Sequence, residues 1–318
     1  MPTDVPAPEP VPADELEPPF AAPRIGRSRP VVPPPQEAHG YWAGAPSACV
    51  VNGVTYLAYR LRRPVGAGRG YAIVVAAAAD GERFETLTVI GKEQVAAESL
   101  ERPALAVTDD GTWRLYLSCA TPGTKHWRVE LLEAADPAAF DPARSSVVLP
   151  GSLNVGVKDP VILRHGGKWH LWASCHPLAD PDQADRMVTD YATSADGLDW
   201  SWHGTVLSGR PGQWDARGTR VAAVVPHEGR TFAYYDGRAS TAENYEERTG
   251  LAVGTGFGVL VAQGGGPVAA SPYGQRGLRY LCALPLPDGG WRLYYEATRA
   301  DGAHELRTEL HPGAGQAG

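Results

Sequence analysis

The chain has 318 residues and a formal net charge of −7, which gives no reason to expect a nucleic acid as its partner. No apolar run approaches the roughly 20 residues that span a bilayer, and the N-terminus has neither the basic start nor the apolar segment of an export signal. We therefore expect a soluble, cytoplasmic protein with no nucleic-acid or membrane partner.

The chain begins with a stretch rich in proline and acidic residues. Such a composition does not build a packed core, so residues 1–21 are predicted to form a disordered arm. The next segment, 22–32, is predicted to be the outer strand of the last sheet, because the sequence ends before that sheet has a fourth strand of its own. Residues 311–318 are predicted to be a flexible tail.

Between these ends, one pattern occurs five times: a short apolar strand, a turn with glycine, and a second strand with aromatic residues at alternate positions. The turn glycines are Gly53, Gly111, Gly167, Gly229 and Gly290, and the second strands cover 54–59, 112–116, 168–172, 230–234 and 290–294. The spacing is about 60 residues. One small sheet repeated five times predicts an all-β fold, a five-bladed β-propeller over residues 22–310 with a ligand-binding central funnel.

Four cysteines fall in four different repeats: Cys49, Cys119, Cys175 and Cys282. None forms a close pair of the kind that holds zinc. We expect them to be small buried residues, and we expect no disulfide, metal site or cofactor.

The innermost strand of each blade lines the channel of a propeller, and its first residues open toward the ligand. These residues are 44–47, 101–103, 158–160 and 218–220, with either 271–273 or 279–280 in the fifth blade. Second strands end at the same rim, which makes Asp236, Glu296 and, just after the strand, Glu246 and Glu247 candidate acids or bases, and His176 a candidate proton carrier. Each acid also has a structural interpretation: Asp236 in a turn, Glu247 and Glu246 in a solvated loop, and Glu296 as the polar end of a strand.

One motif in the third repeat reads Lys158-Asp159-Pro160-Val161-Ile162, and the run 193–200 reads Thr-Ser-Ala-Asp-Gly-Leu-Asp-Trp. Through these motifs and the prolines at 46, 103 and 160, the chain from about 42 to 310 resembles the five-bladed propeller glycosidases. That set contains the arabinanase/xylosidase, invertase-type and mannoside phosphorylase families. The resemblance implies that Asp159 holds the substrate and tunes the catalytic acid. Where the family has its two other carboxylates, this chain has Ala45 and Arg220.

Glycoside hydrolysis normally uses two carboxyl groups, so we expect a rearranged acid/base set. The candidate catalytic residues are Asp159, Asp236, Glu296 and Glu247. The candidate substrate-binding residues are Arg60, Arg102, Lys158, His176, Arg220, Arg238, Arg248 and Trp42. Arg60, Arg102 and Arg220 are expected to converge, either as partners of Asp159 and Glu101 or as a receptor for a carboxylate or phosphate.

The leading hypothesis is a glycoside hydrolase-like enzyme that acts on a glycoside or sugar acid in the funnel. Two alternatives remain open: a propeller that binds a sugar or anion without catalysis, and an enzyme repurposed for a non-hydrolytic biosynthetic reaction. A protein-interaction propeller is disfavoured by the charged and varied funnel residues. In each favoured case the partner is a small carbohydrate or organic anion.

Overall fold

The computed structural model of the chain describes residues 17–313, which form an all-β structure of twenty strands joined by turns and single-turn 3-10 helices. The all-β prediction is confirmed. None of the helices in this described part is long and apolar enough to cross a membrane.

The strands are β1 (Arg29–Val32), β2 (Trp42–Val51), β3 (Val54–Arg62), β4 (Gly70–Ala78), β5 (Glu85–Gly91), β6 (Ala104–Val107), β7 (Trp113–Ala120), β8 (Trp127–Ala134), β9 (Ser146–Leu149), β10 (Val155–His165), β11 (Lys168–Pro177), β12 (Val188–Ser194), β13 (Ser201–Leu207), β14 (Gly218–His227), β15 (Arg230–Arg238), β16 (Arg248–Gly256), β17 (Val259–Ala262), β18 (Leu278–Pro285), β19 (Trp291–Thr298) and β20 (His304–His311). The 3-10 helices are η2 (Ile25–Arg27), η3 (Val65–Ala67), η4 (Lys92–Val95), η5 (Pro142–Arg144), η6 (Pro181–Gln183) and η7 (Thr241–Glu243).

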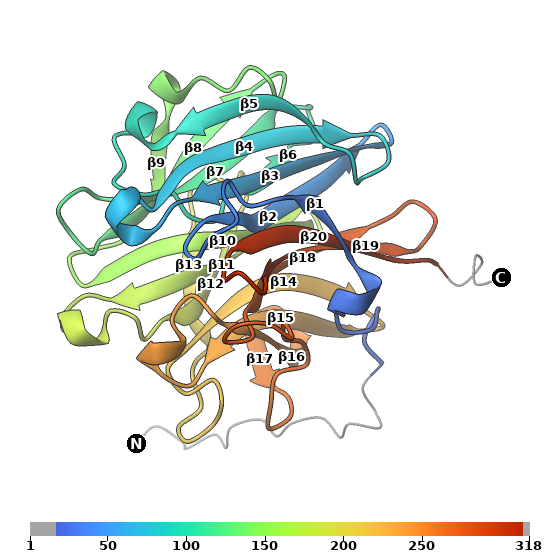
Figure 1. The fold of residues 1–318 in the computed structure, drawn as a ribbon. Helices are drawn as coiled ribbons and strands as arrows, with labels where there is room; N and C mark the ends of the chain where they lie inside the picture. The colour runs from blue at the N-terminus through green and yellow to red at the C-terminus, as the bar shows by residue number, and fades with distance from the viewer. Residues whose placement is uncertain (1–16, 314–318) are drawn as a thin grey trace, which may run out of the picture.

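The strands form four sheets. Three of them, β6–β9, β10–β13 and β14–β17, have four antiparallel strands in chain order. The fourth joins β18–β20 and β1 to β2–β5, and its two halves meet at one parallel residue pair, Trp42 with His304. In Figure 1 the chain runs from β2–β5 through β10–β13 to β14–β17, and β20 returns beside β1 and β2.

The repeated hairpin lies where the sequence predicts it. All five aromatic strands are present as β3, β7, β11, β15 and β19, each preceded by its glycine turn. At the first turn, Asn52 and Gly53 both have positive φ, 51° and 79°. Two such residues give a turn whose twist matches that of the flanking strands, which is why an Asn-Gly pair is favoured there.

The N-terminal segment pairs with β20, and Arg29–Val32 is the part of the segment 22–32 that forms the strand. Ordered packing begins earlier than the predicted end of the arm at residue 21. Phe20 is 5% exposed, and its ring stacks on Tyr234 at 4.9 Å because both are apolar surfaces at the edge of the core. Residues 1–16 of the predicted arm and 314–318 of the predicted tail lie outside the described residues.

The core consists of apolar clusters between neighbouring sheets. One cluster joins Ile73 and Val75 of β4 to Leu115 and Leu117 of β7. Because β7 is buried along its whole length, truncating Leu115 to alanine is expected to cost about 2–5 kcal/mol. These layers fix the inner strands, and the inner strands position the candidate site. The four cysteines are free thiols, three of them buried.

Candidate functional site

Four innermost strands are irregular at the same place. Bulges lie between Gly44 and Ser47 of β2, Lys158 and Val161 of β10, Val221 and Ala223 of β14, and Arg279 and Cys282 of β18. At three of these bulges a residue with a side chain adopts positive φ: Ala45 (53°), Asp159 (52°) and Tyr280 (55°). Such a conformation costs about 1–3 kcal/mol and is typical of functional sites. A bulge also changes the direction of a side chain.

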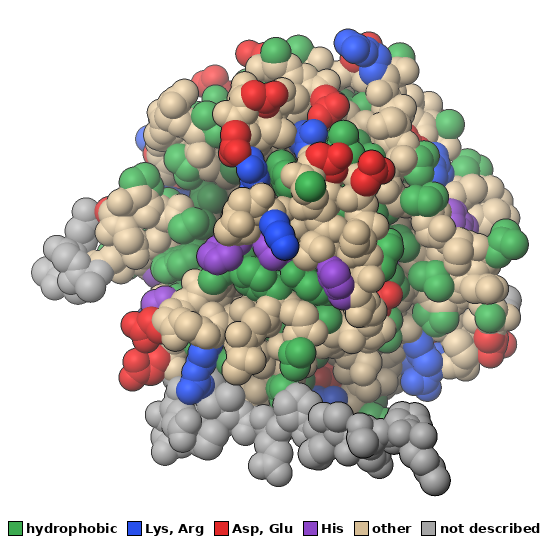
Figure 2. All heavy atoms as spheres, turned by 180° about the vertical axis from the view of Figure 1, so that it is seen from behind, with side chains coloured by type: hydrophobic (Ala, Val, Ile, Leu, Met, Phe, Trp, Pro, Cys, Tyr) green, Lys and Arg blue, Asp and Glu red, His purple; other side chains and the backbone are tan. Residues whose placement is uncertain are grey.

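A cavity of about 420 Å³ includes residues of several of these strands in its lining. Its charged lining consists of Arg62, Arg69, Lys125, Lys158, Arg220, Arg238 and Arg279, with Glu101, Asp182, Asp185 and Glu247. The lining therefore has a formal excess of three positive charges, in a chain whose net charge is −7. On the face shown in Figure 2, acidic and basic side chains are instead interspersed in small groups.

Four cations, Arg62, Arg69, Lys125 and Lys158, form what we call the cationic wall of the cavity. Three of them have long ion pairs: Arg62 lies 3.6 Å from Glu101, Arg69 lies 3.5 Å from Glu98, and Lys158 lies 3.5 Å from Asp159. Aromatic rings support three of them, and the Arg69 guanidinium lies 6.0 Å from the centroid of Trp127. The Lys158 ammonium lies 4.6 Å from the centroid of Trp127, and Arg62 lies 4.0 Å from Trp42 and 4.3 Å from Tyr245. Charges held this way keep donors for a ligand.

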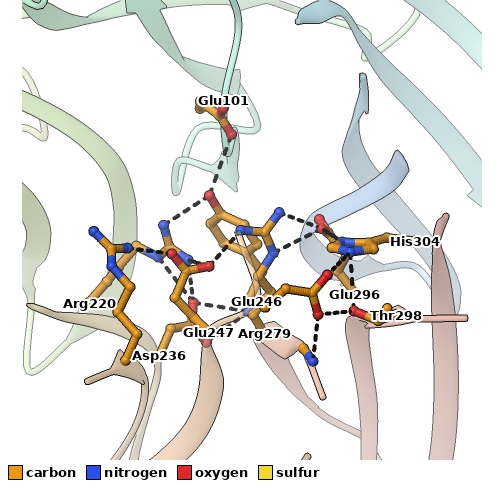
Figure 3. Close-up of polar contacts among 12 residues, drawn as sticks. Glu101, Arg220, Asp236, Glu246, Glu247, Arg279, Glu296, Thr298 and His304 are labelled. Carbon is orange, nitrogen blue, oxygen red and sulfur yellow. Dashed lines mark hydrogen bonds and ion pairs between the residues drawn. The ribbon is translucent and has the colours of Figure 1, made fainter. Parts of the chain in front are cut away.

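A second set of charges is held together by short ion pairs, and we call it the charged floor. It comprises Arg60, Arg220 and Arg279 with Asp159, Asp236, Glu247 and Glu296, each no more than 2% exposed. Arg279 donates to Glu247 at 2.6 Å and to Glu296 at 2.7 Å, as Figure 3 shows. Arg60 donates to Glu296 at 2.8 Å and also contacts Glu101. Short charge-assisted bonds of this kind neutralise both partners.

The rest of the floor is built around Arg220. This guanidinium donates to Asp236 at 2.8 Å, to Asp159 at 3.1 Å and to the hydroxyl of Tyr280 at 3.0 Å. The backbone N–H of Arg102 donates to Asp159 at 3.2 Å. Asp159 is thus the anionic partner of a buried arginine, which is one of the two interpretations left open by the sequence.

The predicted convergence of Arg60, Arg102 and Arg220 is confirmed. Their guanidinium carbons lie 5.6, 6.0 and 3.8 Å from the centroid of the Tyr280 ring. They are also already occupied, because Arg60 and Arg220 have carboxylate partners and Arg102 donates to the carbonyl of Ala222 at 2.7 Å. Arg60 and Arg102 do not line the cavity.

Three acidic residues do not have the structural roles that the sequence offered for them as alternatives to catalysis. Asp236 lies within β15 and Glu296 within β19, so neither is a turn residue or a strand end. Glu247 is buried in the floor rather than in a solvated loop. Glu246 is half-buried and accepts from His304 at 3.0 Å, and His304 in turn contacts Glu296 at 2.7 Å. Figure 3 shows His304 between the two glutamates.

Arginine decides the protonation of the carboxyl groups that face the cavity. Burial alone would raise the pKa of Glu247, but Arg279, Arg238 and Arg220 outweigh burial and hold that pKa below its ordinary range. Burial would also raise the pKa of Glu101, but the charges of Arg60 and Lys158 outweigh it and lower that pKa. Both groups are therefore carboxylates at neutral pH.

Asp236 behaves in the opposite way. Burial raises its pKa more than the neighbouring Arg220 lowers it. This is the shift that a general acid needs, but Asp236 is 0% exposed and does not line the cavity. The acid-like group and the ligand space are therefore separated.

His176 lines the cavity as a neutral imidazole. Burial, with the charge of Lys158, lowers its pKa to about 3. Nδ1 lies 2.9 Å from the carbonyl of Ala184, so Nδ1 carries the proton and donates it, and Nε2 lies 3.2 Å from the Ser174 hydroxyl. Both ring nitrogens thus have partners within the protein.

The structure divides the predicted site residues into two groups. Lys158, His176, Arg220, Arg238 and Glu247 line the cavity, whereas Arg60, Arg102, Asp159, Asp236, Glu296, Trp42 and Arg248 do not. Arg248 donates instead to Glu243 at 2.8 Å. Trp42 lies beneath Arg62 and stacks on His304 at 4.5 Å.

Sequence reasoning did not commit to several lining residues, namely Glu101, Arg62, Arg69, Lys125, Trp127, Tyr245, Arg279 and Tyr280. One signal was available for Arg62. Alternate residues of a strand face the same side, so Arg62 shares the side of Arg60, two residues nearer the rim. Among the described residues, no group of three His, Cys, Asp or Glu side chains is placed to hold a metal ion.

No protein-family model and no curated protein matches this chain. Solved structures are similar to it in fold. The GH43_1 enzyme from Xanthomonas citri complexed with xylotriose has a TM-score of 0.65 at 17% identity, over 89% of each chain. The β-1,2-mannobiose phosphorylase from Listeria innocua, in complex with β-1,2-mannobiose, has a TM-score of 0.60 at 14% identity, over 90% of this chain and 95% of that one.

A glycosyl hydrolase from Bacteroides ovatus is also similar, with a TM-score of 0.60 at 15% identity over 92% of this chain and 93% of that one. At these identities the likeness concerns the fold. The chain has the fold of β-propeller glycoside hydrolases and phosphorylases, which confirms the resemblance predicted from the sequence.

Proposed function

We propose that the cavity binds a carbohydrate that carries an anionic group, such as a sugar acid or a sugar phosphate. The observation that carries the proposal is the cationic wall, where Arg62, Arg69 and Lys158 line one cavity with ion pairs that are 3.5–3.6 Å long, in a chain of net charge −7. Guanidinium and ammonium groups are the usual receptors for carboxylates and phosphates. The anion would neutralise the cationic wall, whose own ion pairs are long.

Two further features support a carbohydrate as the rest of the ligand. Trp127 and Tyr245 contribute aromatic side chains to the lining, and such side chains offer an apolar face with a polar edge. The fold is that of enzymes whose structures hold xylotriose and mannobiose.

We further propose that the four sheets correspond to five blades, with β1 closing the last blade by its pairing with β20.

The site fits ligand binding better than it fits hydrolysis, which would need a pair of carboxyl groups in the cavity. Hydrolysis needs one carboxyl group that donates a proton and another that attacks or activates water. The lowered pKa values of Glu101 and Glu247 suit a base or nucleophile, not an acid. Asp236 has the raised pKa of an acid, but it lies in the charged floor without access to the cavity.

The position of Tyr280 favours a second candidate function, a non-hydrolytic reaction in which the Tyr280 hydroxyl stabilises developing negative charge by donating a hydrogen bond. Tyr280 lines the cavity and is held at a φ of 55°, an expensive conformation for a tyrosine. Its hydroxyl lies 3.0 Å from Arg220 and 3.4 Å from Glu101. Burial raises the pKa of this phenol well above 10, against the opposing charge of Arg220, so it stays protonated at neutral pH.

Matched ligand pairs test the proposal. Calorimetric titrations would compare glucose with glucuronic acid and with glucose 1-phosphate, each at low and at high salt. We expect the anionic member of a pair to bind at least about tenfold more tightly, since a charge-assisted bond contributes about 1.5–3 kcal/mol. We also expect this advantage to shrink with salt. Equal affinity for the neutral sugar, unchanged by salt, would overturn the proposal.

The second candidate is tested with Tyr280→Phe, which removes only the hydroxyl. Turnover of a bound sugar acid that disappears in this variant while binding persists would establish the reaction. Binding without turnover by the unmodified protein, under the same conditions, would reject this candidate and leave recognition as the function.

A further inference from the structure

A second hollow lies directly beside the charged cavity, and we call it the side hollow. Its volume is about 840 Å³, compared with about 420 Å³ for the cavity. The two share Thr124, Lys125 and Ala184 in their linings. A ligand that fills the cavity therefore has room to continue past Lys125 into the side hollow.

The side hollow differs from the cavity in its chemistry. Most of its lining surface is apolar and includes Leu153 and Leu178, with Glu98, Lys125 and His126 also in the lining, whereas the cavity is lined mostly by charged and polar groups. Leu153 is 97% exposed and Leu178 is half-buried. An exposed leucine is ordinary by itself, but here it borders a concave space continuous with the candidate site.

The turn that presents Leu153 is held in place by hydrogen bonds. The N–H of Ser152 donates to the carbonyl of Val155 at 2.8 Å, and the N–H of Asn154 donates to the Ser152 hydroxyl at 3.2 Å. The N–H of Leu178 donates to the carbonyl of Asn154 at 2.8 Å, which ties the two leucines to one framework. The leucine is thus exposed on an organised turn.

The opposite side of the hollow is organised too. In the loop 121–126, the N–H of Thr121 donates to the carbonyl of His126 at 3.0 Å. The Thr124 hydroxyl donates to the carbonyl of Thr121 at 2.9 Å and accepts from the N–H of His126 at 3.0 Å. Binding in a hollow with ordered walls loses little conformational entropy.

We propose that the ligand is amphipathic: an anionic sugar in the cavity joined to an apolar substituent that lies in the side hollow against Leu153 and Leu178. The natural ligand would then be a glycoside of a sugar acid with an apolar aglycone, or a compound of the same chemistry. This inference rests on the proposed function, because the charged end of the ligand is the group that the cavity is proposed to bind.

Chain length tests the inference. Methyl and hexyl β-D-glucuronide would be titrated into the full-length protein, with methyl and hexyl β-D-glucoside as the neutral pair. Full removal of one methylene from water is worth about fourfold in affinity. The side hollow is open to solvent, so we expect the hexyl glucuronide to bind at least tenfold more tightly than the methyl glucuronide.

The variant Leu153→Ser tests whether the hexyl chain lies against Leu153. Since Leu153 is 97% exposed, the variant should fold normally, bind methyl glucuronide within twofold of the unmodified protein, and lose most of the gain from the hexyl chain. Leu310→Ser is the matched control, because Leu310 is 50% exposed and is absent from the lining of both spaces. This control should keep the full gain.

The possible failures can be told apart. If methyl glucuronide binds but the hexyl chain adds less than threefold, or adds as much in Leu153→Ser, the inference is overturned and the proposed function stands. If hexyl glucoside binds as tightly as hexyl glucuronide and its affinity depends on Leu153, the apolar role of the hollow is supported and the anionic sugar is overturned. If neither glucuronide binds, both proposals fall.

Discussion

The charged floor and the cationic wall use the same residue types for different ends. In the floor every arginine has a short bond to a carboxylate, for example 2.7 Å between Arg279 and Glu296. In the wall the ion pairs of Arg62, Arg69 and Lys158 are 3.5–3.6 Å long. Buried charge needs a close partner. The comparison teaches that the strength of pairing, not the presence of arginine, distinguishes structural charge from charge kept for a ligand.

Along two of the second strands, a floor residue and a residue of the cavity lining lie two positions apart. Asp236 of β15 belongs to the floor, and Arg238, two residues later, lines the cavity. Arg60 and Arg62 of β3 show the same relation. Because alternate residues point to the same side, one face of each strand supplies a deep residue and then a rim residue.

The largest effect is expected in the floor. Glu296→Gln keeps the shape of the side chain but removes the charge that Arg60 and Arg279 share. Removing one partner of a buried ion pair typically costs about 3–5 kcal/mol, because the other charge stays buried without compensation. Urea unfolding should show a loss of this size in the free energy of unfolding.

Glu85→Gln provides the control for this prediction. Glu85 is an exposed residue of β5, so its neutralisation should change the stability by less than about 0.5 kcal/mol. Equal stabilities of the two variants would mean that the floor is not the structural element that its short ion pairs indicate.

A smaller loss is expected for Asp159→Asn. Asparagine still accepts the N–H of Arg102, and Arg220 retains Asp236 as its carboxylate partner. We expect a loss of about 1–3 kcal/mol, the usual cost of leaving a buried polar group without its full partner. The family resemblance implies a role of Asp159 in substrate binding instead. Near-native stability together with lost binding of glucuronic acid, measured side by side, would favour the resemblance over the floor.

Sequence alone predicted the repeat well, because hairpin turns and alternating aromatics are local signals. Gly53 and Gly111, for example, lie in their turns as expected. The depth of each side chain was harder to predict. β3 ends at Arg62, whereas the sequence indicated a strand over 54–59. The additional residues of strand place Arg60 in the floor and Arg62 in the lining.

The cationic wall illustrates a second limit. Arg69 and Lys125 come from the connections that follow β3 and β7. Their place in the cavity depends on how these loops pack against neighbouring sheets, which no periodic pattern in the sequence records. Lys158 was predicted because it lies on an inner strand, whose register is set by buried neighbours.

The pH dependence of stability offers an intermediate test at the boundary of the two regions. The pKa of His176 is lowered to about 3 in the folded state, mainly by burial. Below the ordinary histidine value of about 6.5, the unfolded chain binds a proton that the folded chain does not. Stability therefore falls as the pH drops from 6.5, by up to about 1.4 kcal/mol per unit.

His176→Asn should flatten this dependence between about pH 6.5 and 5, the range below the ordinary histidine pKa. Unfolding free energies of the variant and the unmodified protein would be compared at several pH values in that range. His227→Asn, at a half-buried surface histidine, is the control. A slope that persists in His176→Asn but not in the control would assign the effect to a different group.

The smallest effect on stability, and the most specific on binding, is expected in the wall. Lys158→Met keeps the aliphatic stem over Trp127 and removes the ammonium group. Because the Lys158 side chain is 12% exposed and its ion pair to Asp159 is 3.5 Å long, the stability should change by no more than about 1 kcal/mol. Affinity for glucuronic acid should fall about tenfold, the lower end of a charge-assisted bond, while affinity for glucose stays the same. Lys168→Met, at an exposed lysine at the start of β11, is the matched control and should change neither. If the two lysine variants bind the sugar acid equally well, the wall does not recognise the anion. The wall and the floor would then differ only in the length of their ion pairs.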